Sequence, residues 1–199
     1  ATKLMGYVTA FELLGDAAVG QKAKDTFAAL VKMQNEPVAG PRTGGLMHTS
    51  YSHGEGNGEL IASPWMSTLL IDAVERYYIH SGDARVPSFA YGLADFAKTR
   101  DVGTYETAEF DKIPRLYPFY LGGINLTWQE HEQDVYTDLE HAGDVSKLLA
   151  IAYYFSRMAG QPNLDYLSAF SDLYKTQNEL TFPNWIRGIG PSFGKSVYR

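Results

Sequence analysis

The sequence predicts a mainly helical fold made of consecutive antiparallel helical hairpins. The first observation is a recurrence, because residues 64–99 and 144–176 each contain an apolar helical pattern, a glycine break and a second apolar pattern. The second observation is that the connections inside the hairpins are short, whereas those between hairpins are long. We therefore expect residues 1–199 to form a single helical-hairpin domain, or one part of a longer chain.

The N-terminal segment follows this template and predicts the first hairpin. Gly15-Asp16 separates two runs of apolar residues at helical spacing. The outgoing helix carries Leu4, Tyr7, Val8, Phe11 and Leu14, and the returning helix carries Val19, Ala23, Phe27, Leu30 and Val31.

The second hairpin has the clearest boundaries. Ser63 and Pro64 form an N-cap and first-turn proline, and Ser81-Gly82-Asp83 ends the helix. The apolar stripe of its first helix is Met66, Leu69, Leu70, Ala73 and Tyr77, and that of its second is Val86, Phe89, Ala90, Leu93, Phe96 and Ala97.

The third hairpin repeats the pattern. Gly160 is placed to end its first helix. The apolar positions are Val145, Leu148, Leu149 and Ala152, followed by Leu164, Leu167 and Phe170 on the return helix.

Three long segments lie outside these hairpins, at about 36–62, about 100–143 and from about 180 onward. In an up-and-down array, every short turn falls at one end and every long connection at the other, where a ligand site is expected. The 100–142 connection also predicts a small β-hairpin, with strands in 113–121 and 125–128 and a turn at Gly122-Gly123. Pro114 and Pro118 restrict the first of these strands to a sheet edge.

Helical hairpins broken at Gly-Asp, with aromatic and histidine-bearing loops between them, resemble the (α/α) toroid of six-hairpin glycosidases and the related polysaccharide lyases. The resemblance covers hairpin architecture over most of the chain and no catalytic string, so it concerns the fold. Three hairpins make about half such a ring. The chain is then a partial toroid, a piece of a longer protein or a small helical array.

Composition excludes several classes of function. A net charge of -6 offers no basic field for nucleic acid, and no apolar run reaches the about 18 residues that span a bilayer, so we expect a soluble protein. There is no cysteine for a disulfide or a zinc-thiolate site. Without a phosphate-binding loop or dinucleotide fingerprint, we expect no cofactor. The start at Ala1 leaves two interpretations open. Either a secretory signal has been removed, which would give a secreted or periplasmic location, or Ala1 marks a boundary inside a longer chain.

The first long connection contains groups that can move a proton at neutral pH. His48, Tyr51, His53 and Glu55 lie within a glycine-rich stretch, 46–59. One alternative is a surface loop whose polar residues satisfy one another. Another is a metal site of His48, His53 and Glu55, although the spacing matches no established metal motif and we expect none.

The second long connection combines acidic and aromatic residues. Its candidate acid–base groups are Glu130, Asp138 and His141, because crowded carboxyl groups acquire raised pKa values when partly buried. The alternative is a solvated acidic stretch. The candidate stacking platforms for sugar rings are Tyr117, Tyr120 and Trp128, as well as Tyr51 and Trp185. Packing of loops onto helix ends is the alternative, and we favour it for Trp65.

These features predict a carbohydrate-active domain with a poly- or oligosaccharide as its ligand. Hydrolysis would use two carboxyl groups such as Glu55 and Asp138. Elimination at a uronate would use Tyr51 or His53 as the base and Arg42 or Arg115 to neutralise the sugar carboxylate, with His48 among the binding residues. The alternative is a non-catalytic helical domain that binds glycan or packs against another domain of the same parent chain.

Overall fold

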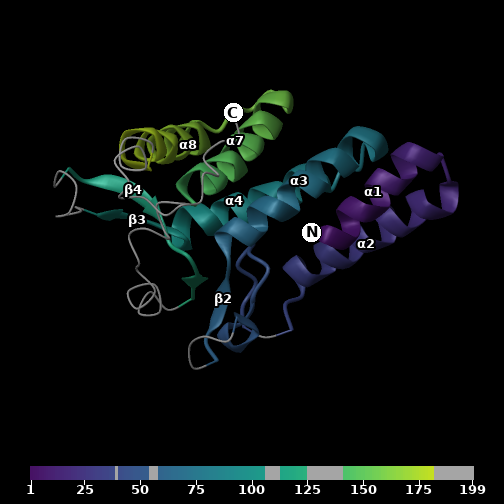
Figure 1. Ribbon diagram of the computed structural model, residues 1–199, viewed down its shortest axis with the longest axis horizontal. Coiled ribbons are helices and arrows are strands. Elements are labelled where there is room, and N and C mark those ends of the chain that lie inside the picture. The colour runs from purple at the N-terminus through teal and green to yellow at the C-terminus, as the bar shows by residue number, and fades with distance from the viewer. Residues whose placement is uncertain (39, 54–57, 106–112, 125–140, 182–199) are drawn as a thin grey trace.

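The computed structural model describes residues 1–38, 40–53, 58–105, 113–124 and 141–181. In this part the fold is mainly helical, with a small antiparallel β component, and the three predicted hairpins are confirmed (Figure 1). The hairpins comprise α1 (Thr2–Leu14) with α2 (Ala17–Asn35), α3 (Pro64–Ser81) with α4 (Val86–Arg100), and α7 (Ala142–Met158) with α8 (Leu164–Thr176). A π-helical turn, Gln177–Thr181, follows α8.

The hairpin turns form where the sequence places glycine and capping residues. Gly15 and Gly82 follow α1 and α3 in the left-handed conformation, with φ of 64° and 56°. The predicted cap at Ser63 is present, because its side chain accepts a hydrogen bond from the Met66 amide at 3.5 Å. Asp16 caps α2 in the same way, accepting from the Ala18 amide at 2.7 Å.

The first helices of the three hairpins, α1, α3 and α7, run in the same direction, with α3 in contact with both of the others (Figure 1). Each is followed by its returning partner, and α4 also packs against α7. The short turns consequently lie at one end of the array and the long connections at the other (Figure 1). We call these the turn end and the loop end.

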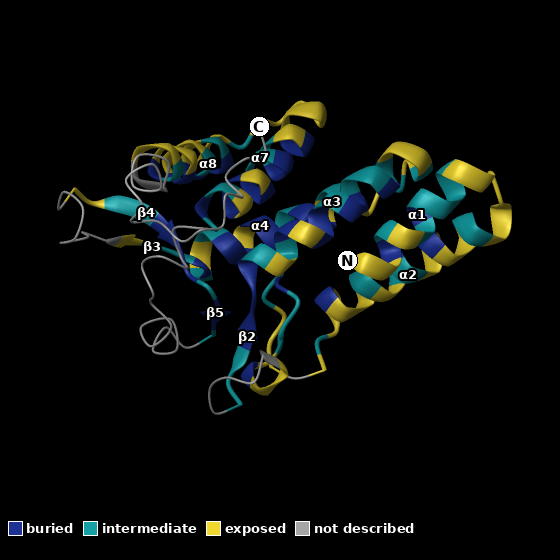
Figure 2. Cartoon of the chain, viewed as in Figure 1, coloured by how far each residue is buried: buried dark blue, intermediate teal, exposed yellow. Residues whose placement is uncertain are grey.

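One continuous apolar core contains residues from all six described helices, and Figure 2 shows their buried faces turned toward one another. Most predicted stripe residues belong to it, including Phe27 and Leu93. Met66, Leu69, Leu14 and Leu164 are exceptions, because their exposed fractions range from 45% to 71%. The two on α3 lie on the side of the helix away from the core, and the other two lie in terminal turns beyond their neighbours' reach.

Two small antiparallel sheets lie at the loop end. One contains β1 (His48–Thr49), β2 (Leu60–Ala62) and β5 (Gly122–Gly123) in the order β1-β2-β5. A short 3-10 turn, Ser50–His53, follows β1. The other sheet pairs β3 (Val102–Tyr105) with β4 (Arg115–Pro118).

A β-hairpin in the second connection is therefore present, but the predicted turn at Gly122-Gly123 was wrong. β4 pairs with β3, which precedes it, and Gly122-Gly123 is a strand instead of a turn. The reason for glycine at 122 is close packing, because a Cβ atom there would overlap the Asp101 carboxyl group and lie 3.0 Å from the Arg100 carbonyl oxygen. The predicted second strand, 125–128, lies outside the described residues.

Candidate functional site

The two long connections meet at the loop end through the pairing of β2 with β5. Ile61 is opposite Gly123 and Ala62 is opposite Gly122, so residues some 60 positions apart in sequence are adjacent. The start of the first connection is also held on α4, because buried Gln34 donates hydrogen bonds from Nε2 to the carbonyl oxygens of Gly44 (2.7 Å) and Phe89 (3.0 Å). The convergence expected from the alternating connection lengths is thus found in the described segments.

Three rings from different segments gather where these connections reach the helices. Trp65 lies in the first turn of α3, Tyr120 lies between β4 and β5, and His141 precedes α7. The Trp65 and His141 rings are 5.4 Å apart with an interplanar angle of 10°. Tyr120 is 6.5 Å from Trp65 at 22° and 6.0 Å from His141 at 31°. We call these residues the aromatic trio.

The relative position of the trio is set by contacts between helix starts. The Thr68 hydroxyl donates to the Asp144 carbonyl oxygen at 3.0 Å, which joins the N-terminal parts of α3 and α7. The Gly143 amide donates to Gln177 Oε1 at 3.0 Å, which holds the start of α7 against the end of α8. Trp65 is three residues before Thr68 and His141 is three residues before Asp144, so their stacking follows from the alignment of the two helix starts.

His141 has a carboxylate partner. Its Nδ1 lies 3.1 Å from Asp144 Oδ2, and the His141 side chain is only 19% exposed. A carboxylate in this position fixes the orientation of the imidazole ring and occupies its Nδ1, which leaves Nε2 as the nitrogen that can meet a ligand. The sequence placed His141 among the acid–base candidates but did not identify Asp144 as its partner, although their separation of one helical turn is a signal that could have done so.

The described residues of the first connection form an arm, residues 48–53 and 58–62, that extends away from the helices (Figure 1). Its buried Ser50 hydroxyl donates to Glu59 Oε2 and accepts from the Gly58 amide, both at 2.9 Å. His48 Nδ1 lies 3.1 Å from the Leu46 carbonyl oxygen. These internal contacts match the alternative of a loop whose polar groups satisfy one another.

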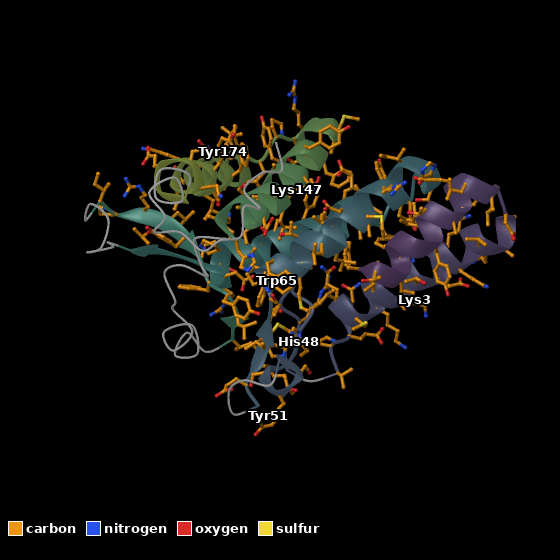
Figure 3. The ribbon with its side chains drawn as sticks, viewed as in Figure 1. Lys3, His48, Tyr51, Trp65, Lys147 and Tyr174 are labelled. Carbon is orange, nitrogen blue, oxygen red and sulfur yellow. The ribbon has the colours of Figure 1, made fainter. Side chains whose placement is uncertain are left out.

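Tyr51 is not brought to the aromatic trio. Figure 3 shows it at the far end of the arm, with His48 between it and Trp65. Its ring is 67% exposed and lies over Gly58, where a Cβ atom would approach it to 2.7 Å. Tyr51 and the trio therefore occupy separate places on the loop end.

Three further predicted binding residues are described, and they differ in accessibility. Tyr117 is 1% exposed because its side chain on β4 faces the protein interior, which is incompatible with the predicted stacking platform. Arg115 Nε lies 3.0 Å from Glu179 Oε2 and its side chain is 8% exposed, so a ligand carboxylate would compete with this ion pair. Arg42 is exposed.

The remaining candidates lie outside the described residues. These are Glu55, Trp128, Glu130 and Asp138, together with Trp185 and the side chain of His53. The metal-site alternative included two of them, His53 and Glu55. Within the described ranges, no group of three or more His, Cys, Asp or Glu side chains is arranged to hold a metal ion.

No protein-family model, curated protein or solved structure matches this chain. In the described part of the chain, none of the helices combines the length and apolar character needed to cross a membrane.

Proposed function

We propose that the loop end binds a poly- or oligosaccharide, with the aromatic trio as its main contact surface. The observation that carries this proposal is that three rings from three segments gather with interplanar angles of 10° to 31°, beside the meeting point of the long connections. Sugar rings present apolar C–H faces that stack on such planes, while neighbouring polar groups bond their hydroxyls. In this proposal Trp65 is a binding residue, whereas its position in the sequence favoured a role in packing the loops onto the helix ends.

In this proposal the fold is a partial (α/α) toroid. Successive hairpins place their first helices side by side in sequence order, α1, α3 and α7, which supports this arrangement. The long connections at one end then correspond to the loops that would surround a ligand. Whether further hairpins complete the ring is a question about the parent gene, and its reading frame would answer it.

Proton transfer at the same site is a second step of the proposal, favoured by the His141–Asp144 pair. An imidazole oriented by a carboxylate suits removal of the proton next to a uronate carboxylate, as in elimination. Hydrolysis by carboxyl groups such as Glu55 and Asp138 is the other reaction, and binding without catalysis is the alternative to both.

Calorimetric titration of the full chain with a panel of neutral and uronate-containing oligosaccharides tests binding. We expect Tyr120→Ala and His141→Ala to weaken binding by about fivefold to tenfold each, as the loss of a stacking contact predicts. The matched control is Tyr174→Ala, which removes a 53% exposed tyrosine from α8. Absence of binding across the panel, or equal affinity of all three variants, would contradict the proposal.

Catalysis is tested separately with the same panel, by reducing-sugar release and by the absorbance of unsaturated products. If His141 acts as a base oriented by Asp144, Asp144→Asn should lower the rate at least tenfold and keep most of the affinity. Binding without product from any glycan would leave the non-catalytic alternative as the function.

A further inference from the structure

A cavity lies at the turn end, between α1, α2 and α3. It has a volume of about 380 Å³, within the range of small-molecule sites. Its walls come from the second half of α1, the first half of α2 and the last turns of α3. These segments adjoin the hairpin turns at the turn end of the array (Figure 1). The cavity is therefore at the opposite end from the aromatic trio.

One wall of the cavity is apolar and held in place. Phe11 and Tyr77 line it together with Val8 and Ala23. The Tyr77 hydroxyl donates to Asp83 Oδ2 at 2.9 Å, and its ring packs on Phe27 at 4.9 Å, so its position is fixed from behind. On the other side, Gly20 allows the Phe11 ring to lie against α2, where a Cβ atom would be 3.0 Å from that ring.

The charges around the cavity are unevenly paired. The Glu12 carboxylate is bound by Arg76 and by His80, whose Nε2 lies 2.6 Å from Glu12 Oε1. Asp25, the other nearby acid on α2, accepts from Gln21 Nε2 at 2.8 Å. Lys24 lines the cavity and has no ion-pair or hydrogen-bond partner among the described residues. The cavity thus combines an apolar wall with one cation that lacks a counter-ion in this part of the structure.

We propose that this cavity binds a small aromatic carboxylate. The ring of the ligand packs against Phe11 and Tyr77, and its carboxylate pairs with the ammonium group of Lys24. Gln21 and Lys24 are exposed, so the cavity opens to solvent at their side. This site shares no residue with the aromatic trio and is independent of the saccharide proposal.

The probe is 2-naphthoate, titrated into the full chain by calorimetry, with 2-naphthamide as its uncharged counterpart. We expect saturable binding of the carboxylate and at least about tenfold weaker binding of the amide, as the loss of one charged contact predicts. Lys24→Gln should weaken naphthoate binding to the level of the amide. Lys22→Gln is the matched control, because Lys22 is on the same helix but does not line the cavity.

A filling variant tests the location. Ala23→Leu places a larger side chain in the cavity and should abolish binding of both probes, while circular dichroism confirms that the helices are retained. Because that variant changes the core, chemical-shift changes on adding naphthoate to the unaltered protein provide a second measurement, expected at Phe11 and Tyr77. Equal affinity for acid and amide, shifts confined to the loop end, or no binding at all would overturn the proposal.

Discussion

Asp101 is a buried carboxyl group that faces a glycine. It follows α4, is 1% exposed, and its Oδ1 atom has no hydrogen-bond partner in the described part of the chain. Burial raises the pKa of this carboxyl group well above its usual value, because the charged form loses its hydration. Its backbone is well bonded, since the Asp101 carbonyl oxygen accepts from the Phe119 amide at 2.6 Å. The main chain of Asp101 therefore holds the second connection against the end of α4, whereas burial of its carboxyl group destabilises the fold.

Asp101→Asn is expected to stabilise the protein increasingly as the pH rises. The pKa of Asp101 in the folded state lies above its unfolded value of 3.8. As the pH rises between these two pKa values, the unfolded state loses its proton first, so the free energy of unfolding of the native sequence decreases across this window. Asparagine does not titrate, and at pH 7 we expect a gain of about 1–3 kcal/mol, the desolvation cost of an unsatisfied group. Urea unfolding at pH 4, 5, 6 and 7 measures this. A difference that stays constant over the series would show that Asp101 titrates as it does in water.

At the scale of single elements, the helices were predictable and the strands were not. The boundaries of α3 follow from Ser63, Pro64 and Gly82, all local signals, and the structure confirms them. The pairing of β2 with β5 joins segments about 60 residues apart, and no local pattern specifies it. Glycine at 122 was misassigned because a turn and a close approach to a side chain both require a residue without Cβ.

The turn between α3 and α4 is held by one carboxylate. Asp83 accepts hydrogen bonds from the Arg85 amide at 3.0 Å, from Arg85 Nε at 2.9 Å and from the Tyr77 hydroxyl at 2.9 Å. The Arg85 guanidinium holds the pKa of Asp83 well below its usual range, although burial of the carboxyl group acts to raise it. The ionised form of Asp83 therefore stabilises this turn.

Asp83→Asn should weaken the fold at neutral pH by about 1–2 kcal/mol, the scale of a charge-assisted hydrogen bond at a partly exposed site. Because the folded pKa is depressed, the contribution is complete above the unfolded value of 3.8 and is lost as the pH falls through the folded pKa. Acid unfolding curves of the variant should accordingly be shallower than those of the native sequence. Asp16→Asn is a matched control, since asparagine also caps helices. Parallel acid transitions for the Asp83 variant and the native protein would contradict this account.

At the scale of the whole molecule, connectivity predicted which end of the array carries the long segments, but not which side chains meet there. Alternation of short and long connections is a property of chain order, so the loop end could be assigned from sequence. The trio depends on the contact of Thr68 with the Asp144 carbonyl oxygen, 76 residues away, and this brought Trp65 into the site. Tyr117 was misplaced for the same kind of reason, because burial on β4 is decided by the helices that cover the strand.

The first hairpin is expected to be the least stable part of the described structure. It joins the array mainly through α1 and α3, whereas α2 meets α4 at few residues, chiefly Phe27 against Phe89 and Gln34 near its end. The turn-end cavity lies between α1, α2 and α3. A smaller number of apolar contacts and the unfilled space of the cavity both lower the free energy needed to open this hairpin locally. The ion pairs of Glu12 with Arg76 and His80 offset part of this loss by connecting α1 to α3.

Native-state hydrogen exchange measures this difference directly. Amides of α2 should exchange faster than those in the middle of α4 and α7, which lie in the shared core. Glu12→Gln should accelerate exchange within residues 2–35 while leaving α7 and α8 unchanged, because the lost contacts connect only the first two hairpins. Lys32→Gln serves as the control. It removes the exposed ion pair between Lys32, in the last turn of α2, and Glu36, the C-cap residue of that helix. If the Glu12 variant accelerates exchange equally in all three hairpins, the molecule opens as one unit and the first hairpin has no separate stability.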